Sequence, residues 1–123
     1  MTISSYLSFM KSNGIPLVDI NPDSDDFAFS IDNAFKAIDI IKKQESSILG
    51  GDILTSDEGK LVYAHELWGS EYHYLNWYCD KIGKEDIESF SKRSYKLAEK
   101  GINEANKIAQ RLEKDCFIVF VIK

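Results

Sequence analysis

Seven consecutive apolar residues near the C-terminal end constrain the fold of this chain most strongly. The run CFIVFVI occupies residues 116–122 and has no alternating polar face. A strand of this kind is stable only when both of its faces are covered, because every exposed apolar side chain loses the free energy of burial. The run therefore predicts a central strand in a sheet that carries other elements packed against it.

Helices are predicted to supply that cover. Apolar residues recur at helical spacing over residues 31–43, directly after Ser30, which is a suitable N-cap. A longer amphipathic pattern over residues 85–113 predicts one long helix, with Gly101 as a point where it could break. A short helix is also predicted over residues 4–12.

Three further strands are predicted between the two longer helices. Residues 47–54 and 60–66 form a hairpin around the polar turn at residues 56–59, and residues 72–79 alternate along their length in the manner of a strand. The 123 residues, with 44% hydrophobic content, suffice to bury one core. We therefore expect a single α+β domain over residues 1–123, with a mostly antiparallel four-stranded sheet and helices packed on it.

Charge is distributed unevenly along the chain. Residues 1–90 carry 7 Lys/Arg against 16 Asp/Glu, and residues 91–123 carry 8 against 4, which gives formal charges of −9 and +4. The basic residues follow one helix among glutamates and form no cationic patch, which argues against nucleic acid as the main ligand. The acidic body suits a basic protein partner.

The composition also predicts the compartment. No segment reaches the ~20 consecutive apolar residues that a membrane-spanning helix needs, and the start of the chain lacks the basic residues of a secretory signal. We therefore expect a cytoplasmic protein that does not bind membranes. Cys79 and Cys116 are far apart in apolar surroundings, and we interpret both as reduced thiols of the core.

His65 and His73 are the candidates for an enzymatic or metal site. Glu66 and Glu71 lie between them, but the spacing matches no metal or acid–base motif, so ordinary hydrogen-bonded strand histidines are the favoured interpretation. A Cys79–His73 nucleophile pair is disfavoured, because an extended chain separates them by roughly 20 Å. We predict no enzyme, no cofactor and no metal. The alternative is a small α+β enzyme or a regulatory oligomeric module with a site around His65/His73.

The segment SILGGDIL at residues 47–54 places two glycines and a carboxylate inside a predicted strand. Glycine weakens a strand, and an unpaired carboxylate is costly to bury. We interpret Gly50 and Gly51 as packing residues that allow a bulge or let an aromatic ring lie against bare backbone. The candidate rings are those of Trp68, Tyr74 and Trp77. Asp52 either joins the acidic surface or finds an inward partner, for which the candidates are a Tyr hydroxyl, a Trp N–H and the Arg93/Ser94 turn.

Three short motifs also carry a resemblance to a known family. They are Leu49-Gly50-Gly51-Asp52-Ile53, Asn76-Trp77-Tyr78 and Ser94-x-x-x-Ala98-x-x-x-Ile102. Together they resemble immunity protein family 40 of bacterial polymorphic toxin systems over residues 31–106, although Leu75 and Gly101 stand where that family tends to have Asp and an aromatic residue. The resemblance implies a non-enzymatic cytoplasmic antidote that binds a cognate toxin and neutralises it by occlusion. The residues expected to be structural are Gly50, Gly51, Asp52, Asn76 and Trp77.

The predicted toxin-binding surface is the region where aromatic side chains and carboxylates gather near a loop. This acidic aromatic surface consists of Asp57, Glu58, Glu66, Trp68, Glu71, Tyr72 and Tyr74. Aromatic residues anchor the centres of interfaces, and carboxylates attract a basic toxin. The competing interpretation is that Trp68 and the tyrosines only cover the sheet edge. The sequence does not indicate the oligomeric state.

Overall fold

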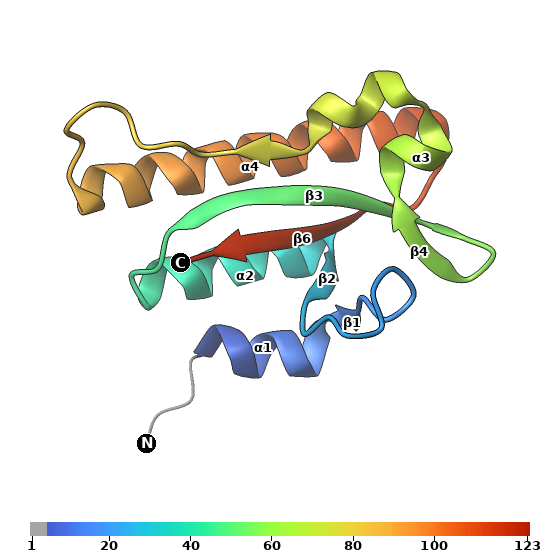
Figure 1. Cartoon of the computed structure of the whole chain (residues 1–123), viewed down its shortest axis with the longest axis horizontal. Coiled ribbons are helices and arrows are strands. Elements are labelled where there is room, and N and C mark those ends of the chain that lie inside the picture. The colour runs from blue at the N-terminus through green and yellow to red at the C-terminus, as the bar shows by residue number, and fades with distance from the viewer. Residues whose placement is uncertain (1–4) are drawn as a thin grey trace.

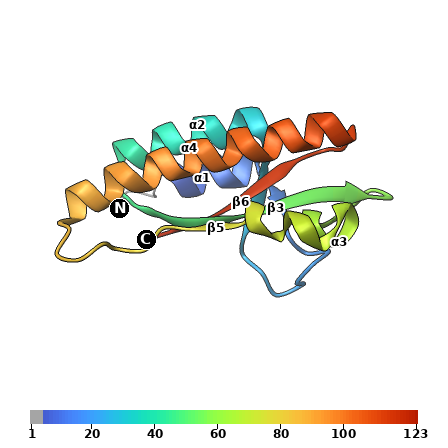
Figure 2. The ribbon, with the colours of Figure 1, turned by 90° about the horizontal axis from the view of Figure 1, so that it is seen from above.

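The computed structural model describes residues 5–123 as an antiparallel sheet with helices α1, α2 and α4 layered on one side of it (Figures 1 and 2). The helices are α1 (Ser5–Asn13), α2 (Ile31–Lys43), α3 (Ala64–Trp68) and α4 (Ile87–Leu112), with a 3₁₀-helix η1 (Ser70–Leu75). The strands are β1 (Ile15–Pro16), β2 (Phe27–Ser30), β3 (Ile48–Asp57), β4 (Lys60–Tyr63), β5 (Trp77–Tyr78) and β6 (Phe117–Ile122). The α+β class with a mostly antiparallel sheet is confirmed.

The sheet has six strands, whereas the sequence predicts four. Its order is β1-β2-β6-β3-β4, with β5 also paired to β3, and every pairing is antiparallel. The two additional strands, β1 and β2, lie before α2, and they are too short to show a periodicity in the sequence. β6 lies in the middle of the order, as its apolar run predicts.

The predicted cover on both faces of β6 is only partly present. Ile118 and Phe120 are buried in the main core with the helices, and Val119 is buried on the opposite face. Val121, which points to the same face as Val119, is 48% exposed. One face of the sheet is therefore fully covered and the other is covered at one end only.

The predicted helices are confirmed, with small shifts of their ends. The Ser30 hydroxyl accepts a hydrogen bond from the Asn33 N–H at 3.3 Å and caps α2. The Asp86 carboxylate caps α4 through the Ser89 N–H at 2.8 Å. α4 continues unbroken through Gly101. The first residue predicted for the N-terminal helix, residue 4, lies outside the described residues.

The segment between β3 and α4 differs from the prediction. The hairpin turn contains only Glu58 and Gly59, both with positive φ, and β4 ends at Tyr63 where the sequence predicts a strand up to residue 66. Residues 70–75 form a 3₁₀-helix, so the strand predicted over 72–79 is wrong except for its last part. The physical reason is a second pattern in the same residues. Trp68, Tyr72 and Leu75 recur at helical spacing, and all three pack against the main core.

A second, smaller core lies on the face of the sheet opposite the helices. It consists of Leu17, Ala28, Leu54, Leu61 and Val119, with Ile20, Tyr63 and Phe117 packed against it. The loop between β1 and β2 supplies Leu17 and Ile20, so this loop covers part of that face. The remainder, around Asp52, Tyr78 and Val121, is flanked by α3 and η1 near Asp52, and we call it the open face. Within residues 5–123, no helix combines the length and the apolar character needed to cross a membrane.

Candidate functional site

Trp77 is wedged between β3 and α4 at two glycines. A Cβ atom at Gly51 would lie 2.3 Å from Cη2 of the Trp77 ring, and a Cβ at Gly101 would lie 3.0 Å from its Cε3. The ring also meets Phe120 edge-on, with 6.4 Å between centroids. Glycine is therefore needed at Gly51 for the close approach of an aromatic ring to the backbone, one of the two roles considered from the sequence, and Gly101 leaves room on the other side of the ring.

The other role, a bulge, occurs beside Gly50. Leu49 is an extra residue between the Ile48–Ile122 and Gly50–Val121 pairs of β3 and β6. A Cβ at Gly50 would lie 2.5 Å from the Trp77 carbonyl oxygen. Both glycines of the segment thus make room for β5.

Asn76 attaches β5 to the same strand by a hydrogen bond. Its side-chain Oδ1 accepts from the backbone N–H of Ile53 at 2.8 Å. With Asn76 bound to the backbone of β3 and Trp77 inserted toward the helices, the next residue, Tyr78, is 83% exposed on the open face. The Asn-Trp-Tyr motif therefore combines two residues that hold the structure and one that is free to make contacts.

Asp52 lies on the open face in a pocket of about 290 Å³. The Asp52 pocket is lined by Asp52, Tyr63, His65, His73, Asn76 and Tyr78. The rings of His65 and His73 are 4.3 Å apart between centroids, and Tyr63 stacks on His65 at 5.9 Å. These side chains come from five elements, β3, β4, α3, η1 and β5, and from the residue before β5.

The Asp52 carboxylate makes no hydrogen bond and no ion pair with residues 5–123. Burial raises the pKa of its carboxyl, and the nearby Asp26 raises it further, whereas His65 and His73 lower it. The side chains that the sequence suggested as inward partners of Asp52 form no hydrogen bond with its carboxylate. Arg93 pairs with Glu85, the Ser94 hydroxyl accepts from the Ile48 N–H, and the indole N–H of Trp77 has no partner among the described residues. Asp52 is therefore a half-buried carboxylate whose burial is only partly compensated, by His65 and His73.

The two histidines lie on helices, so their interpretation as strand histidines is wrong. His65 is in α3 and His73 is in η1. Within residues 5–123 there is no group of three or more His, Cys, Asp or Glu side chains arranged to hold a metal ion. Cys79 and Cys116 are both free and buried, as expected for reduced core thiols, and burial raises the pKa of each.

The acidic aromatic surface is divided by the structure into buried and exposed parts. Trp68 and Tyr72 pack against the main core and meet edge-on, with 6.2 Å between ring centroids. Tyr74 is 59% exposed. The carboxylates are all exposed, and they are Asp57, Glu58, Glu66 and Glu71. The two large aromatic residues therefore cover the core, which the competing interpretation expects, and Tyr74 with the acids is available for contact.

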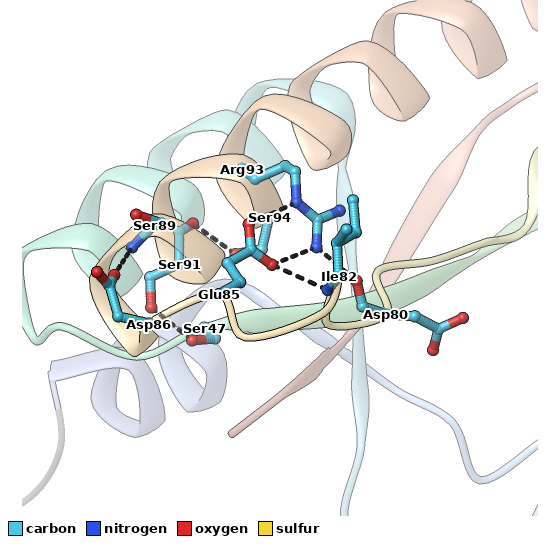
Figure 3. A network of polar contacts seen from close by, with 9 residues as sticks. All are labelled: Ser47, Asp80, Ile82, Glu85, Asp86, Ser89, Ser91, Arg93 and Ser94. Carbon is cyan, nitrogen blue, oxygen red and sulfur yellow. Dashed lines mark hydrogen bonds and ion pairs between the residues drawn. The ribbon is translucent and has the colours of Figure 1, made fainter.

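The loop between β5 and α4 is tied to the long helix by an ion pair (Figure 3). Arg93 on α4 donates from Nη2 to Glu85 Oε1 at 2.8 Å and from Nε to Glu85 Oε2 at 3.0 Å, and it also reaches the Asp80 carbonyl. The hydrogen bond from Arg93 lowers the pKa of Glu85 to about 2. This bidentate pair holds the chain segment that follows Tyr78, so it helps to fix that edge of the open face.

Sequence reasoning missed Tyr63, Tyr78 and Val121 as neighbours of Asp52. Tyr63 faces Leu54, and Tyr78 and Val121 both face Gly50 on the two sides of β3. The alternation of side chains along a strand could have placed Asp52 and Leu54 on one face of β3. The residues of the neighbouring strands on that face can be named only when the register of those strands is known.

No curated protein and no solved structure matches the chain. A family model described as Immunity protein 40 matches residues 10–122. The match is wider than residues 31–106, over which the motifs carry the resemblance, and it includes β1, β2 and β6. The chain therefore belongs to the Immunity protein 40 family.

Proposed function

We propose that this protein is the antidote to a bacterial toxin, which it binds in the cytoplasm and neutralises by occluding the toxin's working surface. The observation that carries the proposal is the family match over residues 10–122. The protein acts by binding alone and does not modify the toxin. The formal charge of −5 suits a basic toxin, because opposite charge accelerates association.

The exposed side chains support a binding role. Tyr74 and Tyr78 are 59% and 83% exposed; Tyr78 lines the Asp52 pocket, and Tyr74 follows His73 of that pocket in the sequence. Tyrosine is enriched at interfaces because it offers a large apolar ring with a polar end. An occluding antidote needs such a surface and needs no catalytic group.

The experiment is co-expression with the toxin domain encoded next to the gene. We expect the chain to restore growth of a bacterial host that expresses this toxin domain, and to form a complex with it that persists through size-exclusion chromatography. A toxin domain encoded elsewhere is the matched control and is expected to remain toxic. Growth that is not restored, or a toxin that leaves the mixture with an altered mass, contradicts neutralisation by binding.

The exposed acids of the acidic aromatic surface are expected to steer the toxin. Replacing Asp57, Glu58, Glu66 and Glu71 together by the corresponding amides should lower the association rate and weaken its dependence on salt, with little change in the dissociation rate. Kinetics at two salt concentrations measure both. An unchanged association rate in the folded variant would show that these acids do not face the toxin's approach.

A further inference from the structure

Several carboxylates of this chain are paired with a cation or a hydrogen-bond donor, and the Asp52 carboxylate is not. Glu85 pairs with Arg93, Glu99 pairs with Lys42 at 3.1 Å, and Asp86 caps α4. Asp52 is less exposed than most acids of this chain, yet its carboxylate has neither a hydrogen bond nor an ion pair with residues 5–123, and His65 and His73 offset its burial only in part. A half-buried charge without a partner costs folding free energy, and a cation brought to it would remove that cost.

The Asp52 pocket has the size and walls to receive one cationic side chain. Its volume of about 290 Å³ lies at the lower end of the range of ligand pockets, which suits a single side chain. The aromatic side chains of Tyr63, His65 and His73 line its wall, and a guanidinium can pack on aromatic rings while its N–H groups bind a carboxylate in a planar fork. An anionic ligand is disfavoured because Asp52 lies in the pocket and Asp26 lies close enough to raise its pKa.

Exposed side chains with apolar surface lie on one side of this charge. Tyr78 and Val121 are 83% and 48% exposed, and they line a neighbouring hollow of about 450 Å³ that also includes Asp52. Val121 borders a third hollow of about 480 Å³ on its other side, between α1 and β6. Interface hot spots are enriched in tyrosine and arginine within a ring of contacts that excludes water, so an exposed tyrosine beside this carboxylate favours a protein partner over a small cation.

We propose that the open face is the toxin-binding surface, and that the Asp52 pocket receives one Arg or Lys side chain of the toxin while Tyr78 and Val121 form an apolar rim on one side of it. The inference rests on the proposed function and names the place and the chemistry of the contact. A second copy of this chain is a poorer occupant, because a two-fold contact centred on the open face would bring two Asp52 carboxylates together.

The test measures affinity for the neighbouring toxin domain with two variants of the pocket. Asp52→Asn keeps the shape of the side chain and removes its charge, and Tyr78→Ala removes an exposed ring that does not support the core. Each is expected to raise Kd at least about tenfold, mainly through faster dissociation. The matched control is Asp39→Asn, the same change at an exposed position of α2 in the helix layer, and it is expected to leave Kd unchanged. The melting temperature of Asp52→Asn should equal or exceed that of the parent, because a half-buried charge that His65 and His73 compensate only in part is removed.

A double-mutant cycle identifies the toxin residue. Each Arg and Lys of the toxin domain is changed to Met and combined with Asp52→Asn, and one position is expected to show about tenfold coupling or more. If the parent binds the toxin and both pocket variants bind as tightly, the inference is overturned and the proposed function stands. If the parent neither binds nor protects, the proposed function fails first. A parent dimer that Tyr78→Ala converts to a monomer, seen by light scattering, would assign the open face to a second copy and overturn the inference.

Discussion

Gly51→Ala is expected to destabilise the protein through a collision with Trp77. The new Cβ would lie 2.3 Å from Cη2, 2.6 Å from Cζ3 and 2.7 Å from Cζ2 of the ring. Carbon atoms in favourable contact are about 3.5–4.0 Å apart, so the ring would have to retreat by more than about 1 Å. The backbone at Gly101 closes the other side, where an added Cβ would already be 3.0 Å from the ring. Overpacking of this kind costs about 1–3 kcal/mol of the free energy of unfolding.

The assay is urea denaturation followed by circular dichroism, together with the thermal midpoint, which for a chain of this size falls by about 3–5 °C per kcal/mol. Gly51 does not have a positive φ, so alanine can adopt its backbone, and the loss of glycine alone would stabilise the protein by about 0.4–1 kcal/mol. A measured loss therefore reports the collision.

Two matched variants separate the collision from other causes. In Gly101→Ala the added Cβ lies farther from the same ring, and alanine in a helix interior gains about 1 kcal/mol of helix propensity. The free energy of unfolding is therefore expected to change little. In a Trp77→Phe background the smaller ring leaves space, and Gly51→Ala should cost less there. An equal cost in both backgrounds, or no cost at all, would refute the reasoning.

Three further predictions concern the scaffold. Ser94→Ala should lower the free energy of unfolding by about 1–3 kcal/mol in urea denaturation, because the buried Ile48 N–H loses its acceptor at 3.1 Å. The pKa of Glu85 is lowered from 4.5 to about 2, so its pairing stabilises the folded state above pH 4.5 and this contribution is lost as the pH falls toward 2. Arg93→Leu should therefore flatten the pH dependence of stability in that acid range. Burial raises the pKa of Cys116 to about 12, so iodoacetamide at pH 8 should label this thiol only after denaturation, as checked by mass spectrometry.

The elements that could be predicted from the sequence are those whose residue pattern is compatible with only one type of secondary structure. Residues 116–122 have no polar face, and this alone places β6 in the middle of the sheet. The apolar stripes of α2 and α4 are long enough to fix both helices and the face that they bury. In the two helices a single periodicity is present and tertiary packing agrees with it, whereas the cover predicted for both faces of β6 fails at the exposed Val121.

The segment from residue 64 to residue 78 could not be predicted, because it contains two periodicities. Tyr72, Tyr74 and Tyr78 fit a strand, whereas Trp68, Tyr72 and Leu75 fit a helix, and local propensity does not choose between them. Packing against the main core decides the choice, since the helical set can be buried together. The Asp52 pocket could not be predicted for the same reason, because two of the residues that line it, His65 and His73, belong to this segment.

The Leu-Gly-Gly-Asp and Asn-Trp-Tyr motifs form one unit in which support and contact are assigned to different residues. Gly51, Asn76 and Trp77 hold β5 against β3 and α4, so the positions of Asp52 and Tyr78 are set before any partner arrives. When the side chains of a pocket are already fixed, less free energy is lost in ordering them on binding. This smaller loss offsets the folding free energy that a half-buried carboxylate costs. It follows that changes in the supporting residues should lower stability first and binding only as a consequence. Changes in the two contact residues should lower binding while the protein remains as stable as before.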